Sequence, residues 1–309
     1  MCIRDRAIAA RELIRPYRRL PQIEPSAVGL TYEDVWLKAR GEDLNIAAWH
    51  IPARDASRAV IIAHGIGGCR SRELTVSSMD LVQELVESGF TVLMLDLRGH
   101  GESDSAYMTY GLNERRDILG AVDWLLAHGY AAGSIGVLGF SMGGVAGIEA
   151  AAEEPAIAAL VVDSACADFL NMMQTHFQRF SKLPLVFIYG SMLIGRFILG
   201  QDLSRLRPAE TLRTIKACQS LIFHGGKDNL VPLAHAQELA QAGQAELVVT
   251  PDVGHLGSYA ANPRTYSRRV IRFFKANLAM PAKLDKAVSY THLRAHETDS
   301  YLVCRLLLE

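Results

Sequence analysis

The sequence GFSMG at residues 139–143 is the strongest local signal of chemistry in this chain of 309 residues. It follows an apolar run, residues 134–140, and opens a stretch rich in alanine and glycine that favours a helix. A serine on such a strand-to-helix turn exposes its Oγ, and the flanking glycines let strand and helix approach closely. The helix N-terminus behind Ser141 also favours developing negative charge. The pattern predicts a nucleophilic serine; the alternative is a glycine-rich turn without chemistry.

Two loops that follow predicted strands supply the partners that such a serine needs. Asp228 lies in HGGKDNLVP, residues 224–232, and His255 lies in a loop after the last apolar run. An imidazole accepts a proton near neutral pH, and a carboxylate holds the ring in the required tautomer. The chain order Ser, Asp, His is the one used by hydrolases with this type of turn. We therefore predict Ser141 as nucleophile, Asp228 as acid and His255 as general base.

Three other residues compete for the acid and base roles. Asp163 ends another predicted strand and is the fallback acid, and Asp252 is a weaker candidate. His235 falls inside a predicted helix, so we expect it to have a surface or packing role.

The sequence HGIGG, residues 64–68, follows the apolar run at 59–63 and predicts an oxyanion loop. The backbone N–H groups of Ile66 and Met142 are expected to bind the oxygen of a tetrahedral intermediate. Losing one such donor typically costs ~10²-fold or more in rate. A simple tight turn is the alternative for the glycines. Four residues are expected to support these loops: His64, Gly65, Gly139 and Gly143.

The sequence DLRGHGES, residues 96–103, combines glycines, charges and a histidine, so a phosphate or metal loop has to be considered. It has no lysine after the glycines as a P-loop requires, and its spacing matches no zinc pattern. We interpret it as a structural loop beneath the active site and predict no cofactor and no metal.

The apolar pattern predicts an α/β fold. Residues 31–51 form an antiparallel hairpin around the turn at 40–43, and short apolar runs then alternate with helical segments. The predicted buried strands are 59–63, 90–95, 134–140, 157–162, 219–223 and 246–249. The predicted helices contain Leu81–Val86, end before Gly89 and Gly129, and span 234–242 and 266–278.

One long segment, residues 167–206, interrupts this alternation and is rich in methionine and aromatic residues. Surplus core helices would explain it, but long insertions in compact domains are often lids. We predict a small helical cap over the strand ends, where open α/β sheets bind ligands.

The composition excludes several classes of protein. The formal net charge is -1, so nothing favours a nucleic-acid partner. Five cysteines without a CxxC pair argue against a disulfide framework and favour a reducing, cytoplasmic compartment.

The two ends of the chain resemble translated sequencing-adapter sequence at residues 1–6 and 288–309. We exclude these segments from the fold and expect the native N-terminus to be missing. Residues 7–30 are a basic leader, interpreted either as a solvated segment or as the remnant of a membrane anchor facing the cytoplasm.

Taken together, these motifs resemble the α/β-hydrolase superfamily, and most closely bacterial hydrolases related to prolyl-oligopeptidase-type and acyltransferase-like enzymes. The resemblance covers about residues 31–279 and includes VVDSACAD at 161–168 and GH at 254–255. It implies a mostly parallel eight-stranded sheet with helices on both faces and a triad of Ser141, Asp228 and His255.

The expected activity is that of a carboxylesterase, which cleaves a small-molecule acyl ester through an acyl-serine intermediate. Thioesterase, acyltransferase or peptidase chemistry with the same triad remains open, as does a non-catalytic scaffold role. Association with a membrane, through a missing N-terminal anchor or through the cap, is a further prediction.

Overall fold

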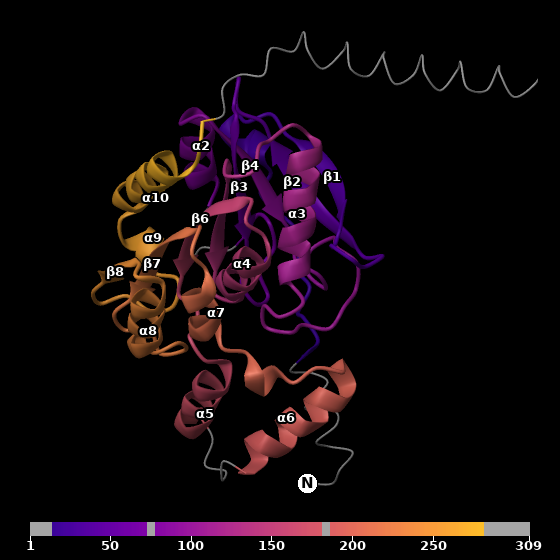
Figure 1. Cartoon of the computed structure of the whole chain (residues 1–309), viewed down its shortest axis with the longest axis vertical. Coiled ribbons are helices and arrows are strands. Elements are labelled where there is room, and N and C mark those ends of the chain that lie inside the picture. The colour runs from indigo at the N-terminus through magenta and orange to yellow at the C-terminus, as the bar shows by residue number, and fades with distance from the viewer. Residues whose placement is uncertain (1–13, 73–77, 181–185, 281–309) are drawn as a thin grey trace, which may run out of the picture. The chain divides into compact units, whose positions relative to one another are not determined.

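The alternating pattern folds into one eight-stranded sheet with helices on both faces (Figure 1). The computed structural model describes residues 14–72, 78–180 and 186–280. The described helices and strands belong to one compact unit, Met1–Ala279. The segments that resemble adapter sequence, 1–6 and 288–309, lie outside the described residues.

The strand order across the sheet is β1-β2-β4-β3-β5-β6-β7-β8. The first two strands form the expected antiparallel hairpin, β2 is also antiparallel to β4, and the other neighbours are parallel. The strands are β1 Glu33–Lys38, β2 Asn45–Ile51, β3 Arg58–Ala63, β4 Phe90–Leu95, β5 Ile135–Phe140, β6 Ile157–Asp163, β7 Gln219–Gly225 and β8 Glu246–Thr250. The predicted mostly parallel eight-stranded sheet is therefore confirmed.

Helices connect the parallel strands, as the pattern predicts. They are η1 Pro25–Val28, α2 Met79–Glu87, α3 Arg115–Ala127, α4 Met142–Glu153, α5 Phe169–Phe180, α6 Val186–Leu199, η2 Leu203–Arg205, α7 Pro208–Thr214, α8 Leu233–Gly243, α9 Ser258–Ala261 and α10 Pro263–Asn277. The pattern did not predict η1, α7 and α9, because segments of four to seven residues carry too little periodicity.

Two apolar clusters hold the three layers together. On one face of the sheet, buried side chains of α3, α4, α7 and α8 pack against the strands. On the other face, α2, α9 and α10 do the same. The central strands are buried on both sides; β3, for example, has all six residues buried. This burial on both faces explains why these strands appear in the sequence as continuous apolar runs. The strand at 246–249 was also predicted as buried, but β8 has no buried residue because it lies at the edge of the sheet.

The last helix illustrates how local signals position the elements around the site. Asn262 caps α10 by accepting a hydrogen bond from the N–H of Thr265 at 3.1 Å, and Pro263 occupies the first turn. The helix then buries Tyr266, Val270 and Phe274 against the sheet. This geometry carries the Tyr266 hydroxyl to the end of β6.

The segment that interrupts the alternation forms the helices α5 and α6, which we call the cap; that it covers the strand ends stays a prediction. The helices α5 and α6 contact each other, and both contact η2; Figure 1 shows them beyond α7, outside the layers that cover the sheet. Among the described residues, no helix combines the length and the apolar character needed to cross a membrane.

Part of the basic leader packs against the domain instead of standing free in solvent. Ile14 is buried, and its carbonyl accepts a hydrogen bond from the N–H of Met108 at 2.8 Å. The Arg18 guanidinium donates to the carbonyl of Ser103 at 2.5 Å. The described part of the leader, residues 14–30, is therefore attached to the loop that follows β4.

Candidate active site

Ser141 lies on a sharp turn between β5 and α4. Its backbone is in the left-handed region, with φ 50° and ψ −113°, a conformation that costs energy for a residue with a side chain. Its N–H donates to the carbonyl of Asp163 at 2.8 Å. A side chain at Gly143 would collide with the carbonyl oxygens of Ala63 and His64. The glycine therefore lets α4 start directly against the end of β3.

The structure brings Ser141, His255 and Asp228 together from the ends of β5, β8 and β7. The Ser141 hydroxyl donates to Nε2 of His255 at 3.0 Å, and Nδ1–H of His255 donates to Oδ2 of Asp228 at 2.7 Å. These residues are 114 and 27 positions apart in the chain. A nucleophile bonded to a base, and a base bonded to a carboxylate, is the geometry that proton transfer from serine requires.

The Asp228 carboxylate is buried and fully engaged. Its second oxygen, Oδ1, accepts from the N–H groups of Leu230 and Val231, both at 2.9 Å. Burial acts to raise the pKa of Asp228, but the hydrogen bond and charge of His255, together with the Val231 N–H, outweigh it and lower this pKa. The group therefore stays ionised near neutral pH and stabilises a protonated His255.

The loop that follows β3 lies next to this turn. Nδ1–H of His64 donates to the carbonyl of Gly65 at 2.7 Å, and Nε2 accepts from the N–H of Leu97 at 3.0 Å. Burial, with the neighbouring His100, lowers the pKa of His64 to about 3. A neutral ring with both nitrogens engaged supports the loop and has no free nitrogen for acid–base chemistry.

The two predicted oxyanion donors differ in exposure. Ile66 is 50% exposed at the tip of its loop, whereas Met142 is buried at the first position of α4. Within the described residues, neither backbone N–H donates to another protein group. Both amides are therefore available to a ligand oxygen.

The loop DLRGHGES holds the oxyanion loop and the residues that follow it through hydrogen bonds with two of its side chains. Nε2 of His100 accepts from the N–H of Gly67 at 3.3 Å, and its Nδ1–H donates to the carbonyl of Arg98 at 3.0 Å. The Asp96 carboxylate accepts from both the backbone N–H and the guanidinium of Arg70, at 2.6 and 2.8 Å. This agrees with the structural interpretation of the loop.

The competing acids and base lie in other contacts. Asp163 is fully buried and accepts from the hydroxyls of Ser164 and Tyr266, at 2.9 and 3.0 Å, with no hydrogen bond to His255. Asp252 pairs at the surface with Lys227 at 2.7 Å. Nδ1 of His235 accepts from the N–H of Ala167 at 3.3 Å inside the packed domain.

An apolar cavity of about 120 Å³ lies between the cap and the domain. Its lining includes Phe169, Met173 and Phe177 of α5 with Ile188 and Met192 of α6. On the domain side, the Tyr110 ring lies 4.5 Å from the ring of Phe169. The next residue, Gly111, packs on Val145 in the first turn of α4. The lining contains no member of the triad, and the loop of Tyr110 and Gly111 links the cavity wall to the helix that Ser141 precedes.

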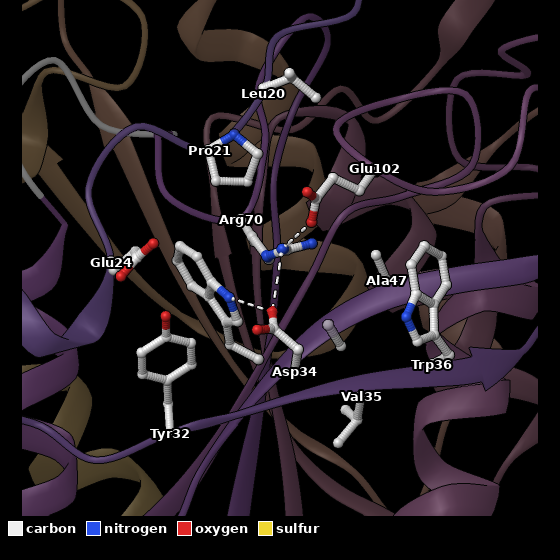
Figure 2. A pocket seen from close by; sticks show the side chains of 12 residues that line it. Leu20, Pro21, Glu24, Tyr32, Asp34, Val35, Trp36, Ala47, Arg70 and Glu102 are labelled. Atoms are coloured by element: carbon white, nitrogen blue, oxygen red, sulfur yellow. Dashed lines mark hydrogen bonds and ion pairs between the residues drawn. The ribbon is translucent and has the colours of Figure 1, made fainter.

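A second hollow, of about 390 Å³, lies over the β1–β2 hairpin (Figure 2). Figure 2 shows Arg70 between Asp34 and Glu102, with which its guanidinium forms ion pairs. Asp34 also accepts a hydrogen bond from the indole N–H of Trp49, so these polar groups of the hollow are bonded to one another. The lining of the hollow includes no member of the triad. Within the described ranges, no group of three or more His, Cys, Asp or Glu residues could hold a metal ion.

Two residues that no sequence motif identified form hydrogen bonds beside the site. Ser164 accepts from the N–H of Leu256, the residue after His255, at 3.2 Å. Tyr266 reaches the same junction from α10. Ser164 stands in the motif VVDSACAD, but nothing in the local pattern shows which side chain faces the His255 loop.

The chain matches one family model and is similar to several known proteins. A family model described as the prolyl oligopeptidase family matches residues 77–281. The Pyrococcus furiosus esterase Pf2001 is 26% identical, with a TM-score of 0.70 over 86% of this chain and 98% of its own. The uncharacterized protein YqkD of Bacillus subtilis is 25% identical over 236 residues, covering 74% of this chain and 75% of its own.

A more distant match shows the fold alone. The acylaminoacyl peptidase of Pyrococcus horikoshii is 17% identical, with a TM-score of 0.61 over 82% of this chain and 43% of its own.

Proposed function

The chain belongs to the prolyl oligopeptidase family of α/β-hydrolase enzymes, and from this premise we propose that it cleaves carboxylic esters through an acyl-Ser141 intermediate. The observation that carries the proposal is the continuous chain of hydrogen bonds from Ser141 to His255 to Asp228. The similarity to the P. furiosus esterase supports an ester as the substrate, and the apolar cavity beside the cap fits an acyl chain.

The geometry accounts for both halves of the reaction. Ser141 Oγ attacks the ester carbonyl while Nε2 of His255 takes its proton, and the N–H groups of Ile66 and Met142 bind the oxyanion. The alcohol then leaves with the proton from His255. Water attacks the acyl group next, His255 accepts its proton, and the carboxylic acid is released as Ser141 recovers its hydrogen. Asp228 keeps the imidazole in the correct tautomer throughout.

The cap cavity is the proposed binding site for the acyl chain. Its lining is largely apolar, with methionine side chains that adapt to irregular shapes. Each methylene buried there is worth about 0.8 kcal/mol, or roughly fourfold in kcat/KM. Activity should therefore rise with chain length until the cavity is filled.

The decisive experiment treats a chain of residues 7–287 with a fluorophosphonate probe, followed by p-nitrophenyl esters from acetate to long chains. Labelling and turnover that disappear in Ser141→Ala, with a maximum at one chain length, are expected. A folded protein that neither labels nor hydrolyses any ester would refute the proposal and favour a scaffold role.

Cleavage of an acylated peptide is a second candidate, favoured by the family match. An N-acyl amino acid p-nitroanilide tested beside the ester series separates the two activities. A higher kcat/KM for the anilide would assign the site to peptides.

Association with a lipid surface also remains a prediction. The outer face of α6 exposes three apolar side chains, Tyr189, Leu193 and Phe197. Flotation with liposomes tests this association, and the parent chain is expected to float with the lipid more than Phe197→Ser. Equal recovery of both proteins in the lipid-free fraction would refute the association. A cytoplasmic location is tested by fractionation of cells that express the chain.

A further inference from the structure

Four residues with side chains have a positive φ at the carboxyl edge of the sheet, and three of them lie around the end of β6. Ser141 follows β5 with φ 50°, Ser164 follows β6 with φ 59°, and Leu256 lies in the loop after β8 with φ 57°. The fourth, Asp252 with φ 61°, pairs with Lys227 at the surface. Such conformations persist only where the surrounding structure holds them, and they concentrate at functional sites. The end of β6 connects all three.

The residues at the end of β6 bond to each neighbouring element. The carbonyl of Asp163 accepts from the N–H of Ser141 at 2.8 Å, and the N–H of Ser164 donates to the carbonyl of Phe223 in β7 at 3.0 Å. The Ser164 hydroxyl then reaches past β7 and accepts from the N–H of Leu256 at 3.2 Å. One side chain thus joins the strand beside the nucleophile to the loop of the base.

The direction of the Ser164 hydroxyl is fixed by its neighbour. It donates its single proton to Oδ1 of Asp163 at 2.9 Å, which leaves a lone pair for the N–H of Leu256. The other carboxylate oxygen of Asp163 accepts from the Tyr266 hydroxyl at 3.0 Å. Asp163 and Ser164 are fully buried, so water does not compete for these bonds.

The loop that carries His255 is held from two sides. On the side of β7, the N–H of Lys227 donates to the carbonyl of Val253 at 2.8 Å. On the side of the nucleophile, the loop backbone is bonded to a side chain, because the N–H of Leu256 donates to the hydroxyl of Ser164. Without it, the backbone next to His255 loses its hydrogen bond on the side of the nucleophile, and the ring is left with its bond to Asp228.

We propose that Ser164 is a positioning residue for the reaction, because its hydroxyl, oriented by Asp163, fixes the His255 loop so that Nε2 faces Ser141 Oγ. The inference rests on the proposed ester hydrolysis for its kinetic consequence, whereas its structural part is independent of activity. A displacement of about 1 Å at a catalytic group can cost ~10²-fold in rate.

The test compares Ser164→Gly with Ser164→Ala. Both lack the hydroxyl, but glycine accepts the positive φ without strain and alanine does not. Both variants are expected to lose about 10- to 100-fold in kcat, with KM within about twofold. The matched control is Ser258→Ala, because Ser258 is buried in α9 and its hydroxyl has no hydrogen-bond partner; its kcat should stay within about twofold.

Hydrogen exchange supplies a readout that does not depend on activity. Peptides containing Leu256 should exchange faster in Ser164→Gly than in the parent chain or in Ser258→Ala. Unchanged kcat together with unchanged exchange would overturn the proposal, and so would a loss of kcat in Ser164→Ala alone, which would indicate backbone strain. If the parent neither labels with fluorophosphonate nor hydrolyses esters, the proposed function fails, while faster exchange at Leu256 would still support the loop contact.

Discussion

The loops after β5 to β8 and the helices α5 and α6 of the cap are built in opposite ways. The loops bury polar groups such as Asp163, Ser164 and Asp228 and bond them to defined partners. The cap instead uses apolar side chains on both of its sides, and Phe197 is 80% exposed. Hydrogen bonds have strict geometry, whereas apolar contacts tolerate changes in shape. The comparison suggests that the loops fix the chemistry and the cap selects the substrate.

The largest expected difference between the two regions comes from replacing one carboxylate in each. Asp228→Asn should lower kcat by about 10⁴-fold, because the amide no longer holds His255 in the correct tautomer. The control is Asp168→Asn, at the start of the cap, where the carboxylate accepts from the N–H of Asn171; we expect less than about a twofold change. Steady-state kinetics with one p-nitrophenyl ester measures both, and similar losses would refute the division of roles.

A second prediction concerns the close approach of strand and helix at the nucleophile. Gly143→Ala should destabilise the fold by about 1–3 kcal/mol or more, because the new methyl group meets the carbonyl oxygens of Ala63 and His64. Thermal unfolding measures the effect. An unchanged Tm would show that the turn at Ser141 relaxes without cost.

The third prediction uses the buried His64. The folded state keeps this ring neutral because burial lowers its pKa to about 3, whereas the unfolded chain binds the proton near 6.5. Stability from this group is therefore complete above pH 6.5 and is lost as the pH falls toward 3. The fall in Tm from pH 7 to pH 5 should be smaller in His64→Gln than in the parent or in His128→Gln, which alters an exposed histidine. Equal slopes in all three proteins would contradict this role.

The fourth prediction tests substrate selection by the two faces of α6. Met192→Ala enlarges the cavity, so the preferred ester should lengthen and the ratio of kcat/KM between neighbouring chain lengths should change by about fourfold. Leu193→Ala changes the adjacent exposed residue and should leave the profile unaltered. Identical profiles for all three proteins would exclude this cavity as the acyl site.

The smallest expected effect is Gly190→Ala in α6. A methyl group there meets no atom within 4 Å, so the substitution should stabilise the chain by at most about 1 kcal/mol through helix propensity. A rise in Tm for Gly190→Ala beside a fall in Tm for Gly143→Ala would confirm that the cap tolerates substitutions that the catalytic loops do not. A large loss of stability would show that the cap is packed as tightly as the sheet.

Much of the fold and of the candidate site could be predicted from local sequence. Each predicted parallel strand formed, and its limits lay within two residues of the prediction, with β7 differing most because it continues to Gly225. The burial of β8 was predicted wrongly, because a local apolar run does not show that a strand lies at the sheet edge. The three candidate triad residues could be named because each occupies a post-strand loop in a recognisable order. Apolar runs and turn residues are local properties, so no tertiary information is needed to find them.

The contacts of Ser164 could not be predicted in the same way. Its hydroxyl meets Leu256 from 92 positions away, and Tyr266 meets Asp163 from 103 positions away. The sequence named Asp163 as a fallback acid because it ends a strand, but the choice of partner depends on where the His255 loop crosses the sheet edge. Only the assembled strands β6, β7 and β8 determine that distance.

The alternation of strands and helices, the turn at Ser141 and the types of side chain after each strand can be predicted from local sequence, because they follow from periodicity and from glycine at defined places. Which of those side chains meet depends on the assembled fold. Parallel strands bring their carboxyl ends to one edge, yet the order β5-β6-β7-β8 and the bonds from Ser164 place His255 between Ser141 and Asp228. Long-range contacts of this kind depend on loop directions in three dimensions, which no local pattern encodes.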